Sequence, residues 1–246
     1  MKKLGLIGHP VGHSKSPSFF KAKLKQIGRY EITYEAFDLS KVKRFSELIE
    51  NNPELMGLNV TIPHKESIID SLCCLDETAK EVGAVNTLVK THKGWKGYNT
   101  DVFGFSTSIK PFLKGRHERA LIFGTGGAAK AVDYSLRRLG IQTVLVSRSP
   151  VEGQIKYNEI TTEALAHYLM IVNCTPLGTW PKIEESVDIP WDGIGEKHFA
   201  VDLVYNPEET TFIKRAKARG AFAMNGSDML RLQAERSLEI WLEHGL

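Results

Sequence analysis

Apolar and polar positions in the first hundred residues alternate between the spacing of strands and the spacing of helices. Short apolar runs predict β-strands, and apolar residues three or four positions apart predict helices. The runs predict strands at 3–8, 30–37 and 56–61 and a hairpin at 86–98. Helices are expected at 16–27, at 41–50 and from Pro63 onward. These elements predict an α/β domain with a mixed sheet.

The alternation restarts at Ala120. Residues 120–123 predict a buried strand, a glycine-rich loop follows, and the next helix runs to Arg138. The remaining expected elements are strands at 143–146 and near 155, 170, 200 and 222, and helices at 161–168 and 209–219. This order predicts a doubly wound, Rossmann-like domain.

A long helix is expected from Ser227 onward. Its apolar stripe consists of Leu230, Ala234, Leu238 and Trp241. Because this helix follows a complete second domain, we expect it to pack back on the first. The predicted organisation is one domain formed by residues 1–102 and 226–246 and a second formed by residues 103–225.

The segment Gly-Leu-Asn-Val-Thr-Ile-Pro-His-Lys, residues 57–65, places Lys65 in the first turn of an expected helix. The N-terminus of a helix carries about half a positive charge, which disfavours a cation there. A surface lysine usually extends its ammonium into water. In a cleft, the dipole would favour the uncharged amine and a nearby acid would favour the ammonium. That balance suits a proton-transfer group.

The loop after the strand at 120–123 matches the dinucleotide-binding fingerprint. It consists of Gly124, Thr125, Gly126, Gly127, Ala128 and Ala129. The glycines permit a tight turn and a close approach to a pyrophosphate, and the following helix N-terminus offers N–H donors. The loop lies between a strand and a helix, as such a site requires. The alternative is a purely structural turn.

The end of the next strand indicates which dinucleotide is bound. NAD sites usually have an acid about 20 residues after the first glycine, to hold the ribose 2′-hydroxyl. This chain has Ser147, Arg148 and Ser149 there. An arginine and two hydroxyls suit a 2′-phosphate, so NADP is favoured over NAD. The alternative is an arginine that caps a surface loop.

Composition restricts the class of protein. The 246 residues are 42% hydrophobic and 25% charged, and the formal net charge is only +3, so we expect no nucleic-acid partner. The sequence predicts no signal peptide and no membrane span. The cysteines are Cys73, Cys74 and Cys174, without metal-ligand spacing. We expect a cytoplasmic protein without a metal, and the sequence leaves monomer and homodimer open.

Polar residues gather at the ends of elements in the first domain. Examples are Ser14, Ser16, Thr61, Asn86 and the triplet 99–101. Taken singly, helix capping and turn formation explain each of them.

Taken together, these motifs resemble the shikimate dehydrogenase family from Gly8 to Trp241. The similar segments are Gly-His-Pro-Val-Gly-His-Ser-Lys-Ser-Pro at 8–17, Asn-Val-Thr-Ile-Pro-His-Lys at 59–65, Gly-Ala-Val-Asn-Thr at 83–87 and Asn-Thr-Asp at 99–101. In the second half they are the glycine loop at 124–128, Asn-Cys-Thr at 173–175, Asp-Leu-Val-Tyr-Asn-Pro at 202–207 and residues 226–233. The occurrence of all of them in this order makes the resemblance specific.

The resemblance implies a function and site residues. It implies reversible reduction of 3-dehydroshikimate to shikimate with NADPH, in the chorismate pathway to the aromatic amino acids. Lys65 and Asp101 are implied as the catalytic pair. Implied substrate-binding residues are Ser14, Ser16, Asn59, Thr61, Asn86 and Gln233. Implied cofactor-binding residues are Gly124, Thr125, Gly126, Gly127, Ala128, Ser147, Arg148, Ser149, Thr175, Tyr205 and Gly226.

The chain departs from the family pattern on the nicotinamide side. The family commonly has Asn-Ala-Thr-Ser-x-Gly-Met, whereas this chain has Asn-Cys-Thr-Pro-Leu-Gly-Thr at 173–179. Pro176 and Thr179 therefore put the local cofactor contacts in question, but not the reaction.

Three rival interpretations stay open. A quinate or aminoshikimate dehydrogenase would share nearly all these motifs, although Arg148 argues against the NAD preference of many quinate enzymes. A non-catalytic NADP-binding regulatory protein would be expected to have lost Lys65 or Asp101. A module that only binds a small carboxylic acid would not need an intact glycine loop.

Overall fold

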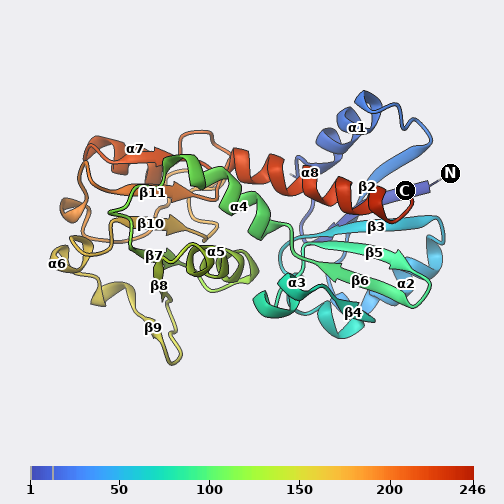
Figure 1. Cartoon of the computed structure of the whole chain (residues 1–246), viewed down its shortest axis with the longest axis horizontal. Helices are drawn as coiled ribbons and strands as arrows, with labels where there is room; N and C mark the ends of the chain where they lie inside the picture. Colours follow the sequence, from blue (N-terminus) through green and yellow to red (C-terminus); the bar gives the residue numbers. More distant parts are fainter. Residues whose placement is uncertain (1, 13) are drawn as a thin grey trace. The chain divides into compact units, whose positions relative to one another are not determined.

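The computed structural model describes residues 2–12 and 14–246, which divide into two compact units (Figure 1). One unit combines Met1–Thr100 with Gln233–Leu246, and the other is Asp101–Leu232. The chain therefore leaves the first unit after Thr100 and returns to it within its last helix.

The first unit contains a mixed sheet, as the sequence predicts, but with six strands, because the short strand β4 was not expected. The strand order is β2-β1-β3-β5-β6-β4. Strand β1 is parallel to β2 and β3, whereas β5 is antiparallel to both β3 and β6. The bounds are β1 (Lys2–Gly8), β2 (Ile32–Asp38), β3 (Leu55–Val60), β4 (Cys74–Leu75), β5 (Thr87–Thr91) and β6 (Gly94–Tyr98).

Helices cover both faces of this sheet. On one face, α1 (Ser16–Gln26) and α8 (Ser227–Glu243) share an apolar cluster that includes Leu4, Phe20 and Trp241. On the other, α2 (Phe45–Asn51), α3 (Glu77–Val82) and the loop after β3 share a cluster that includes Ile7 and Ile68. Short 3-10 helices lie at η1 (Val42–Arg44) and η2 (Ile69–Ser71).

The last helix packs on the first unit, which confirms that expectation. Trp241 is 1% exposed, and its Nε1 donates a 2.9 Å hydrogen bond to the carbonyl of Leu88. A Cβ atom on Gly57 would lie 2.3 Å from that same Nε1. Gly57 thus provides the space in which the indole reaches the sheet.

The second unit contains a six-stranded parallel sheet in the order β12-β11-β10-β7-β8-β9. Counted from β7 and read from the β9 edge, this is the order 3-2-1-4-5-6 of the doubly wound fold. From β7 the chain adds β8 and β9 on one side and then β10, β11 and β12 on the other, so the switch point lies between β7 and β10. The bounds are β7 (Arg119–Phe123), β8 (Gln142–Val146), β9 (Gln154–Ile155), β10 (Met170–Asn173), β11 (Phe199–Asp202) and β12 (Phe222–Met224).

This sheet is also covered on both faces. One apolar cluster joins it to α4 (Asp101–Ile109) and α5 (Gly127–Arg138), through residues such as Phe105 and Val132. The opposite cluster joins it to α6 (Thr162–Leu165) and α7 (Thr211–Ala218), through Leu165 and Phe212. The 3-10 helices are η3 (Lys110–Phe112), η4 (Tyr157–Glu159) and η5 (Trp191–Gly193).

The prediction of a helix that begins at Pro63 is wrong. Residues 61–68 form turns, and only the 3-10 helix η2 follows. Partners distant in sequence hold this segment: Val85 N donates to the carbonyl of Lys65 at 2.8 Å, and the buried ring of His64 hydrogen-bonds the carbonyl of Leu39. Lys65 is therefore not at a helix N-terminus, and the argument from a helix dipole does not apply to it.

Helix α1 starts without a side-chain cap. Ser16 is the first helical residue, and the capping position belongs to Lys15, which makes no side-chain capping bond. Pro17 still lies in the first turn, where its missing N–H does not matter.

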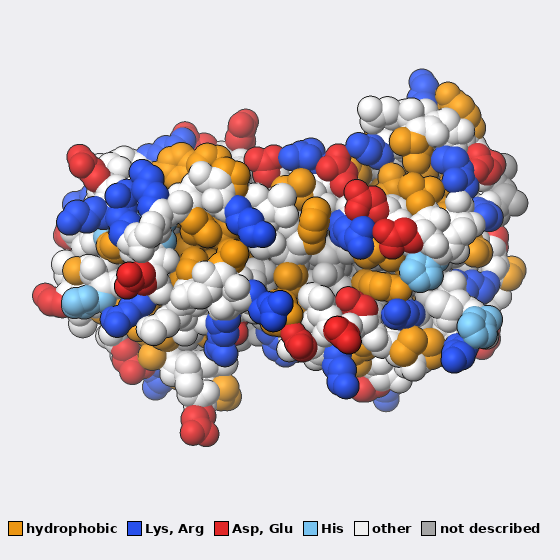
Figure 2. All heavy atoms as spheres, in the orientation of Figure 1, with side chains coloured by type: hydrophobic (Ala, Val, Ile, Leu, Met, Phe, Trp, Pro, Cys, Tyr) orange, Lys and Arg blue, Asp and Glu red, His pale blue; other side chains and the backbone are white. Residues whose placement is uncertain are grey.

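The surface mixes charges of both signs. On the face shown in Figure 2, Lys and Arg side chains alternate with Asp and Glu side chains. This mixture agrees with the small formal net charge of +3. Within the described residues, no helix combines the length and the apolar character that crossing a membrane would require.

Candidate active site

Asn86 is the centre of a buried polar network in the first unit. It precedes β5 and is 2% exposed. Its Nδ2 donates to Thr100 Oγ1 at 2.8 Å and to Gln233 Oε1 at 3.1 Å, and its Oδ1 accepts from Thr100 N at 2.7 Å. One amide thus joins three segments that are distant in sequence.

Asn59, near the end of β3, is held by a second set of contacts. Its Oδ1 accepts a 2.9 Å hydrogen bond from the Tyr34 hydroxyl, and its Nδ2 donates to Ser237 Oγ at 3.1 Å and to the carbonyl of Asn86 at 3.2 Å. The protein therefore fixes both ends of this amide.

Ser237 connects these contacts to the last helix. Its Oγ donates to the carbonyl of Gln233 at 2.9 Å and lies 2.7 Å from Thr87 Oγ1 and 3.1 Å from Thr100 Oγ1. Ser237, Thr87 and Tyr34 were not predicted as site residues from the sequence. A usable signal was the hydroxyl of Ser237, which interrupts the apolar stripe of the last helix.

The two predicted serines lie at the start of α1. Ser14 Oγ accepts a 3.2 Å bond from Ser16 N. Burial raises the pKa of Tyr34 well above its usual value, and the nearby side chain of Ser16 opposes that rise. His13, within the same predicted loop, lies outside the described residues.

The other predicted residues of the substrate domain flank this network. Thr61 is half-buried, and its methyl group lies close against Gly8. Lys65 is half-buried, and its carbonyl accepts from Val85 N, one residue before Asn86. Asp101 is 4% exposed and begins α4 in the second unit. The pairing of Lys65 with Asp101 stays a prediction.

The glycine loop lies at the switch point of the parallel sheet, between β7 and β10. Gly124 has φ +105°, and a Cβ atom there would lie 3.4 Å from Thr175 Cγ2. Gly126 caps α5 without a side chain and faces open space, whereas Ala129 is 1% exposed in the core. The fingerprint requires a tight turn, a backbone that a pyrophosphate can approach closely, and close packing of the helix on the strand. Gly124, Gly126 and Ala129 meet these three requirements in that order.

The N-terminus of α5 suits an anion. Its first turn contains no acidic residue, and no side chain caps it. Backbone N–H groups and the helix dipole therefore favour a phosphate there. Thr125 and Ala128 belong to the same loop and first turn and are half-buried.

The segment after β8 has the charge that a 2′-phosphate needs. Arg148 and Ser149 are exposed, and Ser147 Oγ accepts a 3.2 Å bond from Ser149 N. Burial raises the pKa of Tyr157, and the nearby charge of Arg148 partly offsets the rise. No acid occurs at 147–149 to repel a phosphate.

The remaining predicted cofactor residues follow β10, β11 and β12. Thr175 Oγ1 donates to Asn173 Oδ1 at 2.6 Å. Tyr205 is half-buried, which raises its pKa. Gly226 allows no side chain, because a Cβ atom would lie 2.2 Å from the carbonyl of Leu203.

A buried carboxylate, Asp202, lies at the end of β11. It accepts hydrogen bonds from Asn173 Nδ2 at 2.9 Å, Val204 N at 3.0 Å and Thr210 Oγ1 at 2.5 Å. Burial outweighs these bonds and raises its pKa to about 6. From the sequence, Asp202 stands out only as part of the motif at 202–207, because no local pattern reveals that it is 0% exposed.

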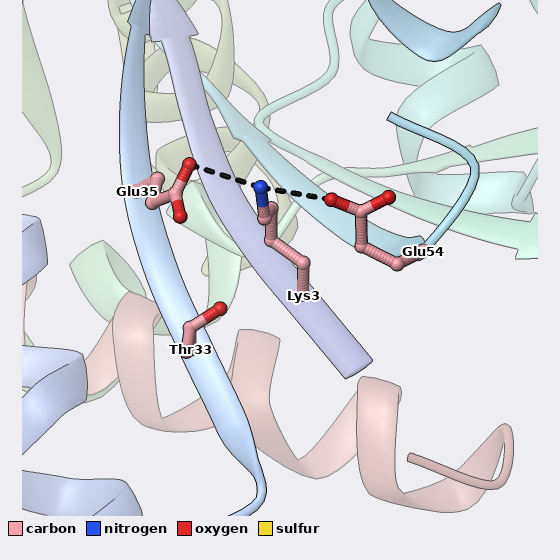
Figure 3. Close-up of a pocket in the computed structure, with 4 residues that line it drawn as sticks. All are labelled: Lys3, Thr33, Glu35 and Glu54. Atoms are coloured by element: carbon pink, nitrogen blue, oxygen red, sulfur yellow. Dashed lines mark ion pairs between the residues drawn. The ribbon is translucent and has the colours of Figure 1, made fainter. Parts of the chain in front are cut away.

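A shallow pocket of about 420 Å³ lies near the start of β1, lined by Lys3, Thr33, Glu35 and Glu54. In Figure 3 the Lys3 ammonium lies between the two carboxylates, at 3.1 Å from Glu35 and 2.9 Å from Glu54. The predicted substrate residues follow the other ends of β1 and β3. With two carboxylates and one ammonium the pocket carries a net negative charge, which does not suit a substrate that is itself a carboxylate, and none of the predicted substrate residues lines it. Nowhere in residues 2–12 and 14–246 do three or more His, Cys, Asp or Glu side chains form a group that could hold a metal ion.

Comparisons with known proteins identify the family of the chain. The profile of the shikimate dehydrogenase substrate binding domain matches residues 6–88. A shikimate dehydrogenase (NADP(+)) of Crocosphaera subtropica is 39% identical over 98% of this chain and 91% of its own. A shikimate dehydrogenase structure from Aquifex aeolicus is 33% identical with a TM-score of 0.88, covering 98% of this chain and 92% of that one. A shikimate 5-dehydrogenase from Thermus thermophilus, in complex with NADP(H) and shikimate, is 31% identical with a TM-score of 0.87 and coverages of 99% and 94%.

Proposed function

The chain belongs to the shikimate dehydrogenase family, and we propose that it catalyses the reversible, NADP-dependent reduction of 3-dehydroshikimate to shikimate. The observation that carries the proposal is the glycine loop at the switch point together with Arg148 after the next strand. This NADP-type arrangement accompanies a unit that matches the family's substrate-binding domain.

We assign the two halves of the reaction to the two units. Met1–Thr100 with Gln233–Leu246 binds the substrate, and Asp101–Leu232 binds NADP. The profile match at 6–88 supports the first assignment, and the 3-2-1-4-5-6 strand order supports the second.

The cofactor-binding residues fit NADP by their chemistry. The loop Gly124–Ala128 and the N-terminus of α5 hold the pyrophosphate through backbone N–H groups. Ser147, Arg148 and Ser149 hold the 2′-phosphate. Thr175, Tyr205 and Gly226 border the nicotinamide. When bound, NADPH supplies the hydride, so the protein's tasks are to bind, to orient and to move a proton.

The substrate is held by the polar residues of the first unit. Ser14 and Ser16 bind its carboxylate, and Asn59, Thr61, Asn86 and Gln233 bind its hydroxyl groups and fix the ring. The hydrogen bonds Tyr34–Asn59 and Asn86–Gln233 support this role, because they hold Asn59, Asn86 and Gln233 in place before the substrate arrives.

Lys65 and Asp101 carry the proton transfer. During reduction, negative charge grows on the carbonyl oxygen as the hydride adds to its carbon. The Lys65 ammonium stabilises that charge and donates a proton to the oxygen. Asp101 orients the ammonium, and in the reverse direction the Lys65 amine takes the proton of the substrate hydroxyl.

Turnover of the Lys65→Ala variant tests this assignment. General acid catalysis typically contributes about 10²–10⁴-fold, so we expect a loss of that size in kcat with little change in the KM for shikimate. The matched control is Lys80→Ala, an exposed lysine of α3, which should keep wild-type turnover. A Lys65→Ala variant with wild-type kcat would refute the assigned role.

We also propose that the protein works in the cytoplasm, as a monomer or a homodimer. The thiols of Cys73, Cys74 and Cys174 are free, as a reducing compartment favours. Light scattering on a size-exclusion column distinguishes the two oligomeric states.

A further inference from the structure

We propose that Asp202 is a positioning residue: through the side-chain amide of Asn173 it orients Thr175 and thereby fixes the loop that borders the cofactor at the switch point. This inference rests on the proposed NADP site. It adds a function to a buried carboxylate that would not itself touch the cofactor.

Asp202 is enclosed by donors. Its Oδ1 accepts from Asn173 Nδ2 at 2.9 Å and from Val204 N at 3.0 Å, and its Oδ2 accepts from Thr210 Oγ1 at 2.5 Å. The side chains of Asp202, Asn173 and Thr210 are all 0% exposed. No water competes for these bonds, so their directions determine how the neighbouring groups are oriented.

The carboxylate is the stronger of two acceptors that set which way the Asn173 amide faces: Nδ2 donates to Asp202 at 2.9 Å and to the carbonyl of Leu177 at 3.4 Å. An ionised carboxylate only accepts hydrogen bonds, whereas an amide donates at one end and accepts at the other. Asn173 must therefore present its NH₂ group to Asp202. Its Oδ1 then faces the opposite way, where it accepts from Thr175 N at 3.0 Å and from Thr175 Oγ1 at 2.6 Å.

Thr175 is consequently fixed in both backbone and side chain. Its hydroxyl proton is used by Asn173, and its oxygen accepts a 3.3 Å bond from Leu177 N. Its methyl group lies 3.4 Å from the position of a Cβ atom on Gly124, the first glycine of the cofactor loop. The hydroxyl can offer only a lone pair to a ligand, which suits a donor such as the amide N–H of a nicotinamide.

The second oxygen of Asp202 is held equally firmly. Thr210 is the N-cap of α7, where its Oγ1 accepts from Ile213 N at 3.3 Å. Its hydroxyl proton is therefore available for Asp202 Oδ2. The start of α7 thus anchors the carboxylate, and the carboxylate anchors the loop after β10.

The test compares Asp202→Asn with Asp202→Ala. In Asp202→Asn, Val204 N keeps the amide oxygen of residue 202 on the side of Asn173, but the charge of the acceptor is lost, so Asn173 is held less firmly. Asp202→Ala removes both oxygens and leaves the NH₂ group of Asn173 without its acceptor at position 202. Asp188→Asn, an exposed residue of the same unit, is the control.

Two measurements are made on each full-length variant: the Kd of NADPH by calorimetry, and the exchange rate of the Thr175 amide proton by NMR without ligand. We expect Asp202→Asn to raise the Kd about tenfold and to speed the exchange, as the loss of one hydrogen bond would. Asp202→Ala should show larger changes in both quantities, and Asp188→Asn should change neither.

Wild-type values in Asp202→Ala would overturn the proposal. A wild-type protein that bound no NADPH would overturn the proposed cofactor, while the exchange rates would still decide for or against the orienting role of Asp202. If Asp202→Ala does not fold, Thr175→Val and Thr175→Ser carry the test. The valine variant, which lacks the hydroxyl, should bind NADPH about tenfold more weakly, and the serine variant should bind like wild type. Equal affinities would contradict the proposal.

Discussion

Asn86 Nδ2 donates a 3.1 Å hydrogen bond to Gln233 Oε1, 147 positions further along the chain. Gln233 is the first residue of the C-terminal segment that belongs to the first unit. The bond therefore joins the polar network around Asn86 to α8, the helix that returns from the second unit. In the proposed function both residues hold substrate, so the return of α8 completes the substrate site.

Ser237→Ala tests whether this network supports the site. The change removes a buried hydroxyl that accepts from Asn59 Nδ2 and lies within hydrogen-bond distance of Thr87 and Thr100. Unsatisfied buried polar groups cost about 1–3 kcal/mol each, so we expect a lower unfolding free energy of that order and a higher KM for shikimate. Chemical unfolding and steady-state kinetics measure the two effects. The exposed Ser71→Ala should show neither, and an unchanged KM in Ser237→Ala would argue against the supporting role.

Arg148→Ala tests the choice of cofactor. A hydrogen bond to a charged group contributes about 1.5–3 kcal/mol, so we expect the KM for NADP to rise about 10–100-fold while the KM for NAD stays the same. The control is Arg138→Ala, an exposed arginine at the end of α5. If the two cofactors were affected equally, Arg148 would not bind the 2′-phosphate.

Gly57→Ala tests the packing that seats the last helix. A Cβ atom at this position would lie 2.3 Å from Trp241 Nε1 and 2.6 Å from Trp241 Cδ1. Overpacking of this kind costs about 1–3 kcal/mol, which a thermal melt would register as a lower Tm. Gly115→Ala, where the added carbon meets no atom within 4 Å, should leave the Tm unchanged. If Gly57→Ala had the Tm of wild type, α8 could move away from the added carbon without loss of stability, which would contradict the proposed packing role of Gly57.

The titration of Asp202 predicts a pH dependence of stability. Its pKa is raised from 3.8 to about 6 in the folded protein because the carboxyl is buried. The folded state binds this proton more tightly than the unfolded state, so the contribution of Asp202 to the unfolding free energy is largest below about pH 4. It falls as the pH rises to about 6, by about 3 kcal/mol in total.

Denaturant unfolding of wild type and Asp202→Asn between pH 4 and pH 7 measures this effect. The unfolding free energy of wild type minus that of the variant should decrease across this range. A difference that stayed constant with pH would contradict the raised pKa.

The glycine loop could be predicted from sequence because its signals are local. Gly124 must adopt a positive φ, Gly126 must leave open space, and Ala129 must pack under the helix. A strand before the loop and a helix after it completed the pattern. The same local periodicity identified the returning last helix and the strands of both sheets except β4, which has only two residues.

Lys65 and Ser237 show where local reasoning fails. Proline in a first turn usually opens a helix, yet Val85 and Leu39, which are distant in sequence, bind the backbone of Lys65 and the ring of His64. Ser237 contacts Asn59 across 178 positions of sequence. Contacts of this kind depend on how the sheet and helices pack, and periodicity along the chain carries no information about them.

The most direct test of the proposed function is the absorbance of reduced nicotinamide when the purified protein is mixed with shikimate and either NADP or NAD. We predict that NADP is reduced, that NAD is reduced much more slowly, and that quinate in place of shikimate gives little reaction. Equal rates with both cofactors would contradict the role of Arg148. No reduction of either cofactor by shikimate would contradict the proposed function itself.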